Sequence, residues 1–280
     1  METISFNNLT FTYPLIEGDL DQNGKQIIPS PIFQNFTGEI PASGLTSITG
    51  PNGCGKSTLM LLASGRLVPQ KGNVLLFGNK IAELSEHKKN LIASVIYQNM
   101  EFDTDDKVSD LLRQVYSNGA YKGKESGINK NDLLEECTFV FNLSSLMEKK
   151  LNALSKGQMQ RVLLAFSILY GSKSIFMDEP LFALEEKDKI ESLKYLKSYC
   201  KEKSKAVFIS MHELDLSKQF ADNVLLMFPN RDMSYGSPDE VLTDSELEKA
   251  YGLPASMLKH QEVMTRQSLS QTAEAFLPKA

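Results

Sequence analysis

The apolar residues of this 280-residue chain follow two periods, one typical of strands and one typical of helices. Apolar side chains recur at about every second position over residues 4–13, which predicts a strand. Residues 158–170 and 185–199 instead show a helical pattern. Because strand-like and helix-like stretches alternate, we expect a mainly parallel sheet that helices cover. The other predicted strands are 32–40, 45–49, 73–77, 93–97, 174–177, 206–210 and 224–227.

Three parts of the chain break this alternation. Residues 17–30 are polar and rich in Gly, Asp, Asn and Pro, which predicts an exposed loop or a long hairpin tip. In the middle of the chain, amphipathic helical stretches at 108–116 and 132–141 flank a Gly/Lys/Ser segment at 117–127, and together they predict a small helical lobe. Beyond residue 238 we expect short helices followed by a poorly ordered polar tail.

The composition excludes several classes of protein. A net charge of −5 argues against a protein that binds nucleic acid through a broad basic surface. Three cysteines and three histidines are far apart in the sequence, so we expect neither a disulfide framework nor a protein metal cage. The longest apolar stretch, around residues 162–170, is much shorter than the roughly 20 residues of a membrane-spanning helix. The first residues show no export signal, and we therefore expect a cytoplasmic protein.

The clearest chemical motif is a glycine-rich loop that fits the pattern G-x-x-x-x-G-K-[ST] between a strand-like and a helical stretch. Its glycines let the backbone curl so that N–H groups point inward, and the helix N-terminus adds partial positive charge. Lys56 is expected to contact the β- and γ-phosphates of a nucleoside triphosphate, and the Ser57 hydroxyl to hold Mg²⁺. The predicted binding residues are Gly50, Pro51, Asn52, Gly53, Cys54, Gly55, Lys56, Ser57 and Thr58.

Two carboxylates follow the apolar strand predicted at 174–177. The carboxyl ends of parallel strands open into one crevice, so Asp178 and Glu179 are expected to lie near the phosphate-binding loop. Asp178 would then hold the Mg²⁺ shell, through water, and Glu179 would polarise a water that attacks the γ-phosphate. Two solvated acids at an exposed strand end are the alternative.

The order of these motifs over residues 3–240 resembles that of ABC transporter ATP-binding subunits, and it is most similar to the ATPases of iron-siderophore, haem and cobalamin importers. The resemblance implies ATP as the nucleotide and a P-loop NTPase (RecA-like) α/β fold. Besides the mainly parallel sheet, it implies an N-terminal antiparallel β-part and a helical subdomain at about 99–157. The ATPase domain would cover residues 1–240, and a C-terminal helical extension and tail would cover 241–280.

The resemblance also implies roles for single residues. Tyr13 stands where the family has an aromatic that stacks on adenine, although a strand aromatic packed in the core would look the same. Gln98 matches a glutamine that contacts Mg²⁺ and the attacking water. His212 matches a histidine that reaches the γ-phosphate and the catalytic water. The implied catalytic residues are Lys56, Gln98, Glu179 and His212, and the implied Mg²⁺ ligands are Ser57, Gln98 and Asp178.

The segment 154–158 resembles the ABC signature, usually written LSGGQ. Ser155 precedes a predicted helix, so its hydroxyl and the next N–H groups form a second anion site. In the family this site closes over the ATP that a second subunit holds. We therefore expect Ser155, Gly157 and Gln158 to bind the ATP of a partner, and two identical chains to enclose two ATP molecules.

Two residues depart from the family pattern. Lys156 replaces a glycine within the signature, and its ammonium group lies either near the γ-phosphate of the partner or, as we favour, in solvent. Glu185 replaces an aspartate that follows the predicted strand at 174–177. Neither change touches the implied catalytic set, so we expect an active ATPase.

The resemblance implies separate permease subunits and, indirectly, a solute-binding protein at the inner face of the cell membrane, with no nucleic-acid partner. Acidic residues at 101–106 are the expected docking place for a basic permease helix, or else a solvated helix start. Residues 235–243 resemble importer ATPases for metal chelates, which favours such a cargo. The alternatives are another importer, an exporter, or a soluble ABC ATPase that drives a cytoplasmic assembly process such as Fe–S cluster assembly.

Overall fold

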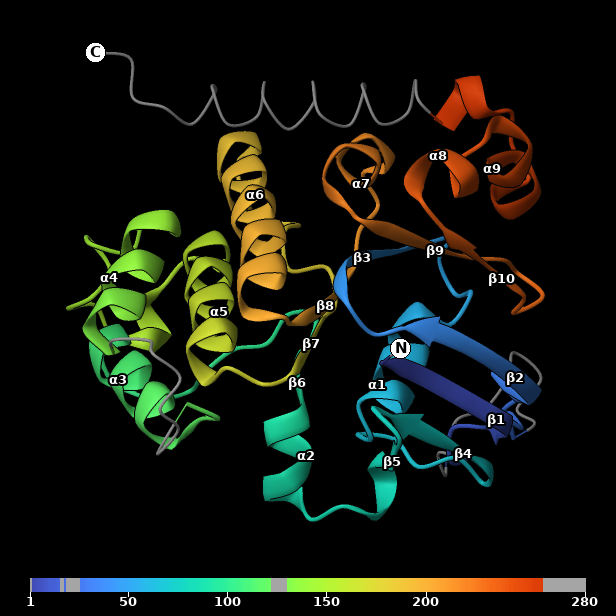
Figure 1. Cartoon of the computed structure of the whole chain (residues 1–280), viewed down its shortest axis with the longest axis horizontal. Helices are drawn as coiled ribbons and strands as arrows, with labels where there is room; N and C mark the ends of the chain where they lie inside the picture. The colour runs from blue at the N-terminus through green and yellow to red at the C-terminus, as the bar shows by residue number, and fades with distance from the viewer. Residues whose placement is uncertain (1, 16–17, 19–25, 122–129, 259–280) are drawn as a thin grey trace.

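The computed structural model describes residues 2–15, 18, 26–121 and 130–258 of the chain. This part forms two β-sheets with helices packed on them (Figure 1). The loop predicted at 17–30 and the segment predicted at 117–127 lie partly outside the described residues, and the tail beyond residue 258 lies wholly outside them.

The larger sheet has six strands in the order β10-β9-β3-β8-β7-β6. β10 pairs antiparallel with β9, and the other neighbours pair parallel. Every residue of β8 is buried, as expected for a strand covered on both faces. The predicted mainly parallel α/β core is therefore confirmed. Its strands are β3 (Gly44–Thr49), β6 (Ala93–Ile96), β7 (Ser174–Met177), β8 (Ala206–Ser210), β9 (Asn223–Met227) and β10 (Met233–Gly236).

The smaller sheet is antiparallel and has the order β2-β1-β4-β5. In β1 the buried residues Ile4 and Phe6 alternate with partly exposed ones, which is the pattern of a strand with one face on a core. The predicted N-terminal antiparallel β-part is thus confirmed. Its strands are β1 (Thr3–Phe11), β2 (Phe33–Pro41), β4 (Lys71–Leu76) and β5 (Asn79–Lys80).

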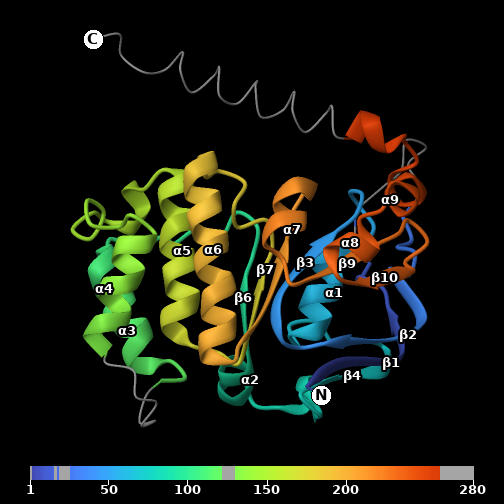
Figure 2. The ribbon, with the colours of Figure 1, turned by 45° about the horizontal axis from the view of Figure 1, so that its top comes forward.

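Helix α1 (Lys56–Ala63) lies between the two sheets, whereas α5 (Lys156–Tyr170) and α6 (Glu186–Lys203) cover the other face of the larger sheet (Figure 2). Successive side chains of a strand point to opposite faces of the sheet, so each strand contributes to the core on both sides. Phe176 and Phe208 share an apolar cluster with α1, and their rings stack with centroids 4.9 Å apart. Their strand neighbours belong to the cluster of α5 and α6.

The helical lobe predicted from the middle of the chain is present. Helices α3 (Val108–Asn118) and α4 (Lys130–Val140) pack against α5 at one edge of the molecule (Figure 1). Their buried residues belong to the same apolar cluster as α5 and α6, so the lobe has no separate core. The boundaries assigned to the subdomain, 99–157, remain a prediction.

A C-terminal layer covers the antiparallel edge of the larger sheet. Helices α8 (Pro238–Val241) and α9 (Asp244–Tyr251) share a third apolar cluster with β9. Thr243 caps α9 through its side chain, and Gly252 ends it in the left-handed conformation that glycine adopts easily. The short helices predicted beyond residue 238 are therefore present. The remaining helical elements are η1 (Ile81–Glu83), α2 (Glu86–Ile92), η2 (Leu151–Ala153) and α7 (Leu214–Phe220).

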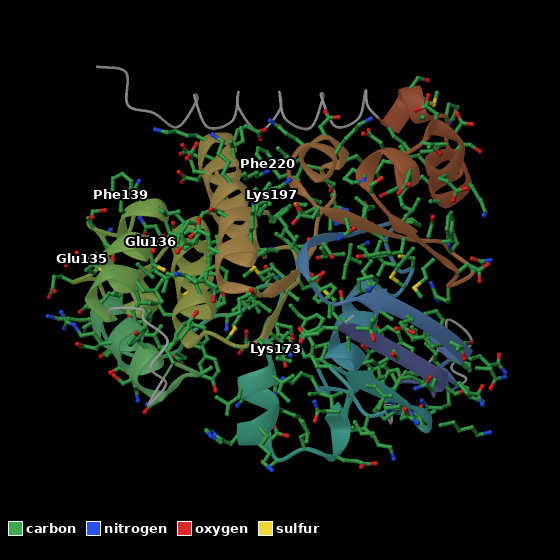
Figure 3. The ribbon with its side chains drawn as sticks, in the orientation of Figure 1. Glu135, Glu136, Phe139, Lys173, Lys197 and Phe220 are labelled. Carbon is green, nitrogen blue, oxygen red and sulfur yellow. The ribbon has the colours of Figure 1, made fainter. Side chains whose placement is uncertain are left out.

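Polar contacts join distant segments at two lysines, Lys197 and Lys173, which Figure 3 labels. Asp222, which follows α7, accepts a hydrogen bond from the Leu45 N–H at 2.9 Å and lies 3.3 Å from the Lys197 ammonium of α6. Lys173 precedes β7, and its ammonium contacts Glu2 while lying 3.9 Å from the ring centroid of Phe77. Both contacts link segments that are distant in sequence. Within the described residues, we find no helix long and apolar enough to span a bilayer.

The stacked pair Phe176 and Phe208 provides a test of the core. Phe176 is buried and fills the space between β7 and α1, so Phe176→Ala should leave a cavity and lower the free energy of unfolding by about 3–5 kcal/mol. Phe139 on α4 is 86% exposed, so Phe139→Ala should change the free energy of unfolding by less than about 0.5 kcal/mol. Urea titrations followed by circular dichroism measure both. Equal losses in the two variants would contradict this description of the core.

Candidate active site

The glycine-rich loop connects the end of β3 to the start of α1, as its sequence predicts. Gly50, Gly53 and Gly55 all have positive φ angles of 76° to 141°, where other residues are strained. At Gly50 a β-carbon would lie 2.4 Å from the Met227 carbonyl oxygen, so no side chain fits there. The backbone of β9 therefore packs directly against the loop. We call residues 50–58 the phosphate loop.

The start of α1 is open to an anion. Its N-cap residue, Gly55, provides no side-chain hydrogen bond, so the N–H groups of the first turn stay available along with the positive end of the helix dipole. The buried Lys56 ammonium donates to the carbonyl oxygens of Gly50 at 2.7 Å and Pro51 at 3.2 Å, which holds it above the loop. This arrangement concentrates positive charge where phosphates would bind.

A cavity of about 650 Å³ opens over this loop. Residues from distant parts of the chain line it, because β6, β7 and β8 all end at this edge of the sheet. We call it the phosphate cavity. It is lined by Ile32, Asn52, Gly53, Gly55, Lys56, Ser57, Thr58, Gln98, Glu179, Phe182 and His212.

Glu179 lies at the centre of a hydrogen-bonded group in this cavity. The side-chain amide of Gln98 donates to one carboxylate oxygen at 2.8 Å, and Nε2 of His212 lies 2.7 Å from the other. The structure thus brings together the three predicted residues that follow β6, β7 and β8. Glu179 also has a φ of +47°, an uncommon conformation for a residue with a side chain, and such residues cluster at functional sites.

Asp178 does not line the phosphate cavity, although it directly precedes Glu179 in the chain. Its backbone N–H donates to the Ile96 carbonyl at 2.9 Å, and one of its carboxylate oxygens accepts from the Ser210 hydroxyl at 2.6 Å. The same hydroxyl accepts from the Glu179 N–H at 2.8 Å. Sequence reasoning misses the role of Ser210; the signal that could have found it is a hydroxyl residue directly after the apolar run at 206–209.

Behind His212, the neighbouring Glu213 is held by Lys189 of α6 at 2.6 Å. Burial opposes ionisation of Glu213, but the Lys189 ammonium and its hydrogen bond outweigh that effect and lower the pKa of the carboxyl. Cys54 in the phosphate loop is different, because burial raises the pKa of its thiol. It therefore serves as a small apolar group beneath the loop.

Tyr13 lies beside the phosphate loop. Its hydroxyl is 3.1 Å from that of Thr58, and its ring meets Phe11 edge-on at 5.0 Å. Tyr13 is 40% exposed and is not among the residues that line the phosphate cavity. The predicted stacking on adenine stays a prediction.

The signature-like segment forms a capped helix start away from this cavity. Ser155 is the N-cap of α5, where its hydroxyl accepts from the Gln158 N–H at 3.3 Å while the Gln158 side chain accepts from the Ser155 N–H at 3.2 Å. A β-carbon on Gly157 would lie 2.6 Å from the Ala183 carbonyl oxygen, which explains the glycine. None of these residues lines the phosphate cavity of the chain itself.

The two departures from the family pattern are both exposed. Lys156 lines a second cavity, of about 480 Å³, between α5 and the segments after β6 and β7. Glu185 is the N-cap of α6, and its side chain makes no capping hydrogen bond there.

The donor groups near the phosphate loop suit a hard cation bound together with phosphate. Ser57, Gln98 and Asp178 offer a hydroxyl, an amide and a carboxylate oxygen, which Mg²⁺ prefers. The bond from Gln98 to Glu179 uses the amide nitrogen, so it leaves the amide oxygen free of that contact and able to serve as a ligand. Within the described residues no cluster of three acids, histidines or cysteines could hold a metal by itself. The site therefore fits a cation that keeps water and phosphate ligands.

Known proteins are similar to this chain in sequence. The chain is 28% identical over 237 residues to the petrobactin import ATP-binding protein YclP of Bacillus subtilis, covering 83% of this chain and 92% of that protein. It is 29% identical over 226 residues to the hemin import ATP-binding protein HmuV of Bordetella avium, covering 77% and 84%.

A solved dimeric ATP-binding cassette in a post-hydrolysis state, bound to ADP and Pi, has the same fold, with a TM-score of 0.69 and 22% identity over 84% of this chain and 98% of that one. The family model described as ABC transporter matches residues 33–182, more than half of the chain. This chain therefore belongs to the ABC transporter family, as an ATP-hydrolysing, ATP-binding subunit of the importer type.

Proposed function

We propose that this chain hydrolyses ATP at the phosphate loop with Glu179 as the general base, and that it powers an importer as a pair of chains bound to separate permease subunits. The observation that carries the proposal is the Glu179 carboxylate, held between Gln98 and His212 at 2.8 and 2.7 Å beside the loop.

The proposed chemistry is an in-line displacement at the γ-phosphorus. The oxygen of a water bonds to phosphorus, the bond to the bridging oxygen breaks, and ADP leaves with the electron pair. Glu179 takes the proton of the water, Gln98 orients that water, and His212 contacts both the water and the γ-phosphate. Lys56 and the N–H groups of the loop stabilise the charge that develops on the phosphates.

Ser57, Gln98 and Asp178 are the proposed ligands of Mg²⁺, with Asp178 acting through water; the Ser210 hydroxyl fixes the orientation of its carboxylate. Bound Mg²⁺ would neutralise phosphate charge and orient the γ-phosphate. Tyr13 is the proposed adenine contact, since its ring lies beside the end of the phosphate loop.

The pairing of two chains rests on the position of Ser155. Its hydroxyl and the first N–H groups of α5 form a candidate anion site, and Ser155, Gly157 and Gln158 do not line the phosphate cavity of their own chain. We propose that Ser155, Gly157 and Gln158 contact the γ-phosphate held by a second, identical chain. The dimeric form of the solved cassette supports this arrangement.

The second cavity is the proposed docking place of a permease helix. Apolar side chains from α5 and from the segments after β6 and β7 line it, together with the two acids Glu101 and Asp103 and the single base Lys156. A short amphipathic helix with basic residues complements such a groove. The cavity adjoins Gln98 in sequence, so docking there would be coupled to the catalytic group.

The proposed cargo is a metal chelate, such as a ferric siderophore, haem or cobalamin. The similarity to proteins named for petrobactin and hemin import supports it. We also propose the domain division 1–240 and 241–280, with the helical subdomain at about 99–157.

The role of Glu179 predicts the result of an isosteric substitution. Glu179→Gln should lower the ATPase rate by about 10²–10⁴-fold, because the amide cannot accept the proton, while ATP binding persists. Phosphate release and equilibrium binding of ATP measure the two effects. Glu191→Gln on the exposed surface of α6 is the matched control and should change neither. Unchanged hydrolysis in Glu179→Gln would overturn the assignment.

The pairing predicts an ATP-dependent dimer. In the Glu179→Gln background, saturating ATP and Mg²⁺ should convert the chain to a dimer on size-exclusion chromatography, because the bound γ-phosphate is retained. Adding Ser155→Arg should block the contact by its bulk and leave monomers that still bind ATP, whereas Ser198→Arg on α6 should still dimerise. A chain that stays monomeric with ATP, both alone and with its membrane partner, is incompatible with the proposal.

The docking groove predicts a separation of two activities. A variant with Glu101→Lys and Asp103→Lys should keep its ATPase rate but no longer co-purify with the membrane fraction, since like charges then face a basic helix. Glu191→Lys is the control for the change of charge. Co-purification of the double variant at the wild-type level would contradict the proposal that the permease docks at the acidic groove. The permease recovered with the wild type, reconstituted in vesicles, then tests uptake of an iron chelate.

A further inference from the structure

A residue that is distant in sequence from the phosphate loop donates a hydrogen bond to it. Arg231 lies in the turn between β9 and β10, and its Nη1 donates to the carbonyl oxygen of Gly53 at 2.7 Å. Its Nε donates to the carbonyl oxygen of Ile32, just before β2, at 3.1 Å. Gly53 and Ile32 both line the phosphate cavity. The guanidinium thus links two residues of the cavity lining, although Arg231 itself does not line the cavity.

The turn that presents Arg231 is well defined. The Phe228 N–H donates to the Asp232 carbonyl at 2.9 Å, and the Arg231 N–H donates back to the Phe228 carbonyl at 3.0 Å. The side-chain amide of Asn230 donates to the Asp232 carboxylate at 2.7 Å. Arg231 itself has a φ of +73°, which glycine adopts easily and which strains a residue with a β-carbon. The chain therefore keeps an arginine where the backbone alone favours glycine.

The bridge acts on the charge around the phosphates as well as on geometry. Carbonyl oxygens carry partial negative charge, so those of Gly53 and Ile32 would repel a nearby triphosphate. A guanidinium bonded to both offsets that charge and adds a full positive charge close behind the loop. Its planar fork can hold two acceptors at once, which an ammonium group on a flexible stem does less well.

The neighbouring contacts support this link between the C-terminal layer and the phosphate loop. Met227 at the end of β9 packs its carbonyl against Gly50, as described above. At the other end of the layer, the Tyr251 hydroxyl of α9 lies 3.1 Å from that of Thr49, the residue before the loop. The β9–β10 turn and α9 therefore contact the loop and its leading strand at separate points.

We propose that Arg231 is a positioning residue for ATP: it fixes the phosphate loop against the Ile32 wall and favours binding of the triphosphate without touching the reacting atoms. The proposal rests on the proposed binding of ATP at the phosphate loop. It predicts an effect on ATP affinity and KM, with kcat nearly unchanged.

The decisive variant is Arg231→Gly, because it removes the guanidinium while relieving the strain of the positive φ. It should keep or raise the thermal unfolding midpoint and still raise the Kd and KM for ATP by on the order of tenfold, the loss expected for a charged hydrogen bond. The kcat should stay within about twofold. Wild-type KM and Kd in Arg231→Gly would overturn the proposal, since a purely structural role would leave them unchanged.

Arg231→Lys separates charge from bridging. It retains the positive charge but cannot hold both carbonyls in the same plane, so its Kd should stay raised by at least about threefold. A wild-type Kd for ATP in Arg231→Lys would contradict the proposed bridge between the two carbonyl groups. Arg113→Met, on the exposed surface of α3, is the control and should match the wild type.

Lys56→Ala distinguishes this proposal from the one it rests on. If Lys56→Ala loses ATP binding while the Arg231 variants bind normally, only the role of Arg231 fails. If Lys56→Ala binds ATP as the wild type does, the phosphate loop itself is misassigned.

Discussion

The parallel pairing of β3, β8, β7 and β6 is the constraint on which the site depends. Parallel strands end at the same edge of a sheet, so the segments that follow them meet there. The phosphate loop follows β3, and Gln98, Glu179 and His212 follow the other three strands. A strand that ran the opposite way would carry its polar residues to the far edge. The catalytic group that we propose is thus a direct consequence of sheet topology.

A second requirement of the proposed function is electrostatic, because an acidic side chain lies in the cavity where the phosphates would bind. Glu179 is held by an amide N–H and by an imidazole nitrogen, and its backbone is held by the Ser210 hydroxyl. Lys56, the N–H groups at the start of α1 and, as we propose, Arg231 supply the opposing positive charge. The carboxylate can therefore stay close to the phosphates while groups at the ends of the two neighbouring strands, β6 and β8, fix its orientation.

The signature-like turn shows why one chain is an incomplete unit under the proposed function. The capping box of Ser155 and Gln158 builds an anion site whose residues do not line the phosphate cavity of the same chain. Gly157 and Gln160 instead contact the backbone at Ala183, in the segment that follows Glu179. The turn is therefore fixed to the catalytic segment of its own chain while it offers its N–H groups to another molecule.

The sequence by itself determined the local features: the phosphate loop between a strand and a helix, the period of the buried strands, and the capped turn at Ser155. These depend on residues close together in the chain, through glycine conformations, alternation and capping. Only the tertiary structure decided the contacts between distant segments. The bond between Gln98 and Glu179 spans 81 residues, and that between Arg231 and Gly53 spans 178. The place of Lys156 in the lining of the second cavity likewise depends on how α5 packs against the segments after β6 and β7. Such contacts depend on how helices and sheets pack, and no short pattern of residues encodes that packing.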